Sequence, residues 1–159
     1  MRRNRKLEFG ASYYLTCNIN RFKEELKEDD IKELFVTTLK RAKEKFKFDV
    51  YDIIILNDHF HMVLKPDPKD KDIYLLSKIM QWILSVFAIN YNKKTGLKGK
   101  VWYDRFKSEI IETAEEIVKF VERIKANFVR FGIDKIVNYR YCAKYFIDIG
   151  SSLITPIFT

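Results

Sequence analysis

Two apolar stretches joined by a short polar turn constrain the fold of this chain more than any other feature. Residues 48–56 read FDVYDIIIL and residues 59–65 read HFHMVLK, with Asn57 and Asp58 between them. Each stretch has the length and the β-branched and aromatic content of a buried strand. Asn and Asp favour turns because their side chains bond to nearby backbone groups. The sequence therefore predicts a β-hairpin.

Five further segments have the periodicity or composition of regular secondary structure. β-Forming residues favour a strand over 11–18, and a less regular strand is expected over 101–111. Apolar residues recur at helical spacing over 29–45 and 73–91, which predicts two amphipathic helices. A third helix is predicted over 113–131.

The third helix has recognisable ends. Thr113 and Glu116 form a capping box, which satisfies backbone N–H groups at a helix start, and Gly132 suits the position after its end. The type of the element over 139–149 stays open. The order strand, helix, strand, strand, helix, strand, followed by a helix, is typical of an α+β ferredoxin-like sandwich with an antiparallel sheet.

Length and composition favour one compact domain. The chain has 159 residues, of which 47% are hydrophobic. We expect a single domain over 1–159, with a basic arm over 1–10 and a tail over 146–159. No apolar run reaches the roughly 20 residues of a membrane span. The N-terminus lacks the apolar stretch and cleavage site of a signal peptide. We therefore expect neither a membrane span nor a signal peptide.

Cysteine usage and net charge bound the compartment and the partner. Cys17 and Cys142 are far apart and form no CxxC arrangement, which favours ordinary thiols in a reducing cytoplasm. Thirty Lys and Arg residues against 22 Asp and Glu residues give a formal charge of +8. Such a surface favours a polyanion because each neutralised phosphate releases counterions. Simple solubility is the alternative explanation.

The chain has two histidines, and both lie in His59-Phe60-His61. Residues i and i+2 of a strand point to the same face, so the two imidazoles can chelate one divalent cation while Phe60 points to the opposite layer. Imidazole suits Zn, Cu, Fe or Ni, whereas oxygen ligands and water favour Mg or Mn, so the pair does not fix the metal. Such a metal would polarise a phosphate oxygen. The alternative is a strand that carries two histidines without a metal.

The stretch NDHFHMVLKP, residues 57–66, resembles the N-H-V-H-L-L-L region of REP-associated tyrosine transposases, single-tyrosine insertion-sequence transposases of the HUH superfamily. The likeness continues over 76–111, where the family has a helix, a glycine-bearing loop and W-x-x-R-[FY]-K-S. The next helix resembles the family's R-Y-I-x-x-N-P-V-R-A-G-L. The residues that match the second motif are Trp102, Arg105, Phe106, Lys107 and Ser108. The likeness covers about residues 10–145.

The resemblance implies a chemistry without a nucleotide cofactor. In the family, a tyrosine on the last helix attacks a DNA phosphate held by a divalent metal, for which Mg or Mn is expected. The attack forms a 5′-phosphotyrosine and frees a 3′-hydroxyl, which can later reverse the reaction on another strand. The third protein ligand of the metal lies one helical turn after that tyrosine, on the same helix face. The implied partner is single-stranded or hairpin DNA.

This sequence departs from the family at the nucleophile. The family's Y-x-x-x-N falls on Arg123 and Asn127, so the resemblance implies a metal held by His59, His61 and Asn127. A guanidinium stays charged and cannot act as the nucleophile. Arg123 either clamps a DNA phosphate or pairs with an acidic neighbour.

Three explanations follow for the catalytic residue. The favoured one is a protein that binds DNA and does not cut it. Alternatively, Tyr14 or Tyr103 substitutes as nucleophile, or a metal-bound water hydrolyses the strand. A non-catalytic nucleic-acid-binding regulator that has lost the metal is the alternative function.

Basic residues interleaved with aromatics favour binding of a single strand, because unpaired bases can stack. The alternative is a set of solvated loops and a frayed terminus. The apolar stretch 85–91 is either buried or a homodimer contact. The expected DNA contacts are Arg2, Arg3, Arg5, Lys93, Lys94, Lys98, Lys100, Trp102, Arg105, Lys107, Arg123 and Arg130.

Overall fold

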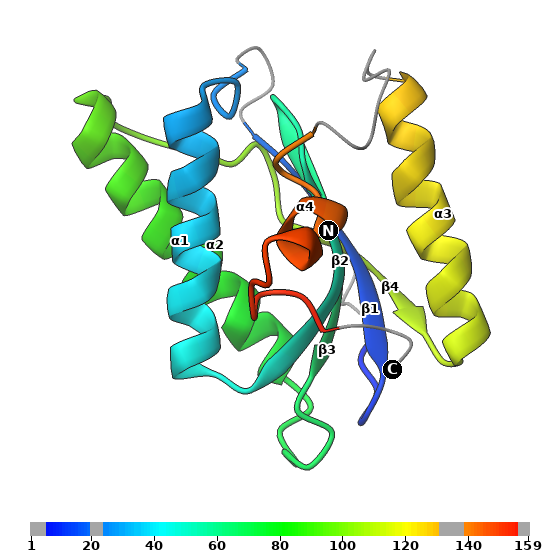
Figure 1. The fold of residues 1–159 in the computed structure, drawn as a ribbon. Coiled ribbons are helices and arrows are strands. Elements are labelled where there is room, and N and C mark those ends of the chain that lie inside the picture. Colours follow the sequence, from blue (N-terminus) through cyan, green and yellow to red (C-terminus); the bar gives the residue numbers. More distant parts are fainter. Residues whose placement is uncertain (1–5, 20–23, 131–138, 156–159) are drawn as a thin grey trace.

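The computed structural model describes residues 6–19, 24–130 and 139–155, and for 127–130 it describes the backbone alone. Its elements follow the predicted order (Figure 1). They are β1 (Ser12–Asn18), α1 (Asp29–Lys45), β2 (Phe48–Ile55), β3 (His59–Pro66), α2 (Leu75–Thr95), β4 (Lys107–Ile111), α3 (Ala114–Arg130) and α4 (Ala143–Asp148).

The four strands form one sheet in the order β2-β3-β1-β4, and neighbouring strands run antiparallel. This order and the βαββαβ sequence of elements confirm the expected ferredoxin-like sandwich. Figure 1 shows α1 and α2 on one face of the sheet and α3 on the other. The sheet therefore lies between two helical layers, and each of its faces packs against a different one.

The β2–β3 hairpin forms as predicted. The Leu56 amide donates to the His59 carbonyl at 2.8 Å and so closes the turn. Phe60 and Met62 have no exposed surface and belong to the main core, which also contains Phe35 of α1 and Phe87 of α2. Because side chains alternate along a strand, His59 and His61 point to the α3 side of the sheet.

The α3 helix begins with the predicted Thr113–Glu116 pair, but the Glu116 side chain reaches the Glu112 amide and not the Thr113 amide of a standard capping box. The Glu116 amide donates to Thr113 Oγ1 at 3.2 Å, and Glu116 Oε2 accepts from the Glu112 amide at 3.1 Å. Phe120 and Ile124 are buried against the sheet in a second apolar cluster. The helix thus fixes one apolar face on the same side as the histidines. Gly132 lies outside the described residues.

The fourth strand is shorter than expected. It begins at Lys107, not at 101, because residues 103–106 interrupt the pairing with β1. An isolated bridge between Ile19 and Trp102 resumes the pairing beyond this interruption. Residues 103–106 therefore form a loop between the bridge at Trp102 and the start of β4 at Lys107.

The remaining differences lie at the ends of elements. The α2 helix continues past Tyr91 to Thr95, and Gly96 ends it with a φ of 73°. The element left open over 139–149 contains α4, and before it the Tyr141 carbonyl accepts from the Ile55 amide at 2.9 Å. This segment therefore covers the outer edge of β2. Within the described residues no helix is both long and apolar enough to cross a membrane.

Candidate metal centre and nucleic-acid interface

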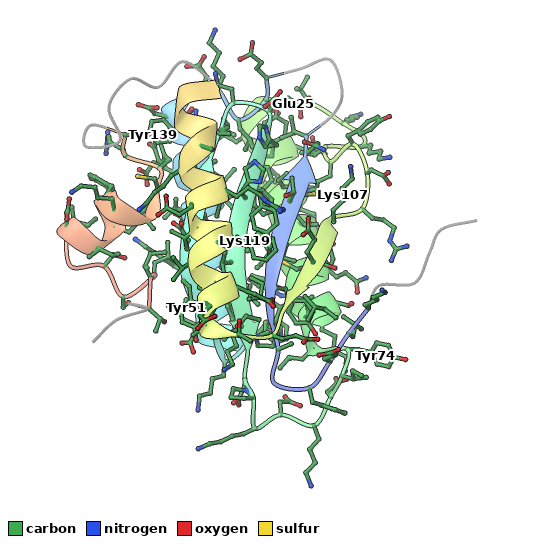
Figure 2. All side chains as sticks on the ribbon, turned by 90° about the vertical axis from the view of Figure 1, so that its right-hand side faces the viewer. Glu25, Tyr51, Tyr74, Lys107, Lys119 and Tyr139 are labelled. Atoms are coloured by element: carbon green, nitrogen blue, oxygen red, sulfur yellow. The ribbon has the colours of Figure 1, made fainter. Side chains whose placement is uncertain are left out.

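The α3 face of the sheet carries a band of polar side chains at one end. The register places His61 opposite Thr16 of β1, which in turn lies opposite Lys107 of β4. His59 lies opposite Asn18, the last residue of β1. Figure 2 looks onto this face, with α3 crossing in front and Lys107 at the edge strand. The histidine pair and a basic edge therefore share one end of the sheet.

Each histidine is oriented through its Nδ1 atom. Nδ1 of His59 lies 2.6 Å from Asp58 Oδ1. Nδ1 of His61 lies 2.6 Å from the Tyr14 hydroxyl and 3.1 Å from Thr16 Oγ1. Partners at one ring nitrogen fix the ring and direct ligation to the other nitrogen. Any metal held by this pair would therefore be bound through the two Nε2 atoms.

The geometry of the pair fits a shared cation. The two imidazole centroids are 4.8 Å apart, and both side chains are largely buried on the same face. A carboxylate bonded to the far side of a ligating imidazole is a common arrangement at metal sites. Among the described residues no group of three or more His, Cys, Asp or Glu side chains could hold a metal. The described residues thus supply two imidazoles, and the identity of a third protein ligand stays a prediction.

The expected third ligand, Asn127, lies on α3, but its side chain is outside the described residues. The backbone of this helix lies beside the histidine pair. Phe120 stacks on Tyr14 with ring centroids 5.0 Å apart, and Tyr14 bonds to His61. The face of α3 that carries Phe120 therefore packs beside the histidine pair. Ligation by Asn127 stays a prediction.

The turn before His59 is held by several contacts. The Asn57 carbonyl accepts from the Leu26 amide at 2.9 Å, and the Asp58 carbonyl accepts from the Ile19 amide at 2.8 Å. Lys32 of α1 donates from Nζ to Asn57 Oδ1 at 3.1 Å, and only 3% of this residue is exposed. A buried ammonium requires such acceptors. The position of Asp58, and through it that of His59, is therefore fixed from three directions.

Arg123 is paired with an acidic neighbour, one of the two roles expected for it. Its Nη1 atom donates to both carboxylate oxygens of Glu109, at 3.1 and 3.4 Å. Its guanidinium lies 4.7 Å from the ring centroid of Phe120 and 5.4 Å from that of Tyr14. These contacts hold the guanidinium over the ring whose hydroxyl contacts His61.

Tyr14 is poorly suited to the alternative role of nucleophile. Its ring is only 6% exposed and lies beneath Phe120 and Arg123. Burial raises the pKa of the Tyr14 hydroxyl above its usual value, which disfavours the phenolate form. Tyr14 therefore orients His61 in this arrangement. Tyr103, the other alternative, is 40% exposed and lies beside the end of β1.

Apart from Arg123, the expected DNA contacts divide into three groups. Lys93, Lys94, Lys98, Lys100, Arg105 and Lys107 are exposed at the end of α2 and along the chain to β4. Trp102 is not at the surface, since it is 8% exposed and its Nε1 donates to the Leu84 carbonyl at 3.0 Å. We leave it out of the interface. Arg2, Arg3, Arg5 and the side chain of Arg130 lie outside the described residues.

Four contributors to the site were not expected from the sequence, and they are Thr16, Lys32, Asp58 and Glu109. The sequence predicts Asp58 only as a turn residue, although a carboxylate directly before a strand histidine is also suited to orient that histidine. Glu109 and Lys32 gave no such signal, because each lies far along the chain from its partner. Strand register and helix packing bring them to the site.

Comparisons with known proteins identify the family and the fold. Residues 10–127 match the family described as "Transposase IS200 like". The fold is similar to that of a REP-associated tyrosine transposase bound to a REP hairpin, with a TM-score of 0.75, 20% identity, and coverage of 99% of this chain and 89% of that one. A putative transposase from Deinococcus radiodurans R1 is 12% identical, with a TM-score of 0.49 over 77% of this chain and 97% of that one. No curated protein matches the sequence.

Proposed function

Because the chain belongs to the family of IS200-like transposases, we propose that it binds single-stranded or hairpin DNA at a divalent metal held by His59 and His61. The metal, with Mg or Mn expected, would polarise a phosphate oxygen of the bound strand. Asn127 of α3 would supply the third protein ligand. The observation that carries the proposal is the orientation of both imidazoles through Nδ1, by Asp58 and by Tyr14 with Thr16.

Charge and location support DNA as the partner. The exposed lysines and arginines between α2 and β4 lead to Lys107, which lies across β1 from His61. Phosphate contacts of this kind supply affinity without sequence preference. The similar REP-associated transposase is bound to a hairpin, which makes a hairpin with a single-stranded flank the first substrate to test.

The proposal includes binding without a covalent link to DNA. Arg123 stands where the resemblance places the nucleophilic tyrosine, and Arg123 cannot attack a phosphodiester. In its place the guanidinium would donate to a phosphate oxygen, in exchange for Glu109. The residues of this chain would then hold a DNA phosphate next to the metal, and no P–O bond of the strand would be broken.

Metal-dependent binding is the direct test. Affinity for a labelled hairpin with a single-stranded flank is measured by fluorescence anisotropy, with Mn²⁺ and with EDTA. We expect Mn²⁺ to tighten binding by the parent protein and to have no such effect on the His59→Ala, His61→Ala variant. If the variant bound Mn²⁺ and DNA as the parent does, a metal site at His59 and His61 would be ruled out. Metal-independent binding by both proteins would instead favour the metal-free regulator.

A further inference from the structure

The loop over residues 103–106, which connects the Trp102 bridge to β4, exposes the ring of Tyr103. Trp102 and Phe106 are 8% and 7% exposed, whereas Tyr103 between them is 40% exposed. The two buried rings fix both ends of the loop in the core. Tyr103 is therefore exposed on a loop whose two ends are anchored in the core.

Hydrogen bonds fix the loop further. The Tyr103 amide donates to the Asn18 carbonyl at 2.9 Å, and the Trp102 indole donates to α2. Asp104 contributes twice, since its carbonyl accepts from Cys17 Sγ at 3.9 Å and its carboxylate accepts from the Arg105 amide at 2.7 Å. A ring on a fixed backbone loses little conformational freedom when a ligand stacks on it.

The loop lies close to the histidine pair. Asn18, which accepts from the Tyr103 amide, is the register partner of His59. Adjacent strands are about 4.8 Å apart, so the backbone at Tyr103 is roughly 10 Å from that at His59. A strand whose phosphate lies at His59 and His61 would pass this loop as it leaves the sheet at the β4 edge.

Charge separates Tyr103 from the other exposed aromatics. Lys100, Arg105 and Lys107 are exposed near it in the chain. Phe9 and Tyr74, at 64% and 62%, are exposed more fully. Phe9 lines a depression together with Glu8, Asp67, Asp70 and Asp72, and Tyr74 lies in the chain between Ile73 and Leu75, which also line it. A polyanion would be repelled there and attracted at Tyr103.

We propose that the Tyr103 ring is a stacking platform for an unpaired base of the DNA strand held at the histidine pair. This inference rests on the proposed function and adds a base subsite to it. Stacking of bases on aromatic rings tolerates any sequence, because every base has a π-face. Arg105 and Lys107 would contact the phosphates on either side of the stacked base. Tyr103 then acts as a binding residue and not as the nucleophile considered above.

The test compares Tyr103→Leu and Tyr103→Trp in the full chain, with Mn²⁺ present. The probes are an oligothymidine of about 12 nucleotides and a strand of equal length in which abasic spacers replace the nucleosides. We expect Tyr103→Leu to weaken binding of oligothymidine roughly tenfold and to leave binding of the abasic strand unchanged. Tyr103→Trp should bind oligothymidine at least as tightly as the parent does.

Tyr74→Leu is the matched control, because Figure 2 shows Tyr74 near the opposite end of the molecule from Lys107. It should change neither affinity. Equal losses by Tyr103→Leu on both probes would indicate a structural effect and overturn the inference, as would no loss on oligothymidine. If the parent protein bound the hairpin with a single-stranded flank but not oligothymidine, only the base subsite would be overturned. Failure to bind either of these two probes would contradict the proposed function itself.

Discussion

At the scale of single residues, the unusual feature is an arginine whose charge is already partly satisfied. Arg123 contacts Glu109 and two aromatic rings, and its side chain keeps 45% of its surface exposed. The resemblance identified the position, and either a phosphate or a carboxylate was expected as the partner of Arg123. The sequence could not identify Glu109, because that residue lies on β4 and meets α3 only through packing.

Substitution of Glu109 tests whether the carboxylate competes with DNA for Arg123. Glu109→Gln should tighten binding of the hairpin with a single-stranded flank about threefold at low salt, because the guanidinium no longer has to leave a carboxylate. The gain is small because an exposed ion pair contributes at most about 1 kcal/mol. Glu115→Gln, on the exposed first turn of α3, is the control and should have a smaller effect. Weaker binding by Glu109→Gln would contradict competition for the guanidinium.

Asp52 gives a pH dependence of stability that is independent of DNA. Burial raises its pKa to about 7, compared with about 3.9 in an unfolded chain. Between these values the folded state binds more protons, so the free energy of unfolding falls as pH rises from about 4 to 7. Asp52→Asn should therefore be more stable than the parent at pH 8 and similar at pH 4.5. Urea unfolding at the two pH values measures this, and equal stability at pH 8 would contradict it.

At the scale of elements, the β2–β3 hairpin was the most predictable part of the fold. Its apolar strands and its Asn57-Asp58 turn specify it locally, and β3 begins at His59 as expected. The fourth strand was predicted too long, because apolar and aromatic residues at 101–106 resemble a strand. The structure uses Trp102 and Phe106 as buried anchors of a loop instead. Local patterns do not distinguish these two uses of buried residues.

The hairpin turn also gives a prediction about metal binding. Lys32 donates a hydrogen bond to Asn57. Asp58, which follows Asn57 in the chain, is hydrogen-bonded to His59, so Lys32 is a positioning residue for the histidine pair. Loss of a partner in the outer shell of a site commonly weakens metal binding 10- to 100-fold. We expect about tenfold weaker Mn²⁺ binding by Lys32→Met, measured by calorimetry. Lys40→Met, on the exposed face of α1, should bind as the parent does, and equal affinities for both variants would rule out this role.

At the scale of the whole molecule, the sandwich brings distant segments to one end of the sheet. The end of β1, the start of β3 and the start of β4 meet there through their register. Residue types and spacing indicated the histidine pair and the basic segment, and the resemblance added Arg123 and Asn127. Which side chains orient the histidines depends on the packing of the sheet, of α1 and of α3, and the sequence does not show it.

If the proposed function is correct, this chain holds DNA at the histidine pair without a covalent link. The most direct test incubates the protein with Mn²⁺ and a labelled hairpin that has a single-stranded flank, then separates the products under denaturing conditions. We predict metal-dependent binding before denaturation and no protein–DNA adduct after it. A denaturant-resistant adduct formed by the parent protein would contradict the claim.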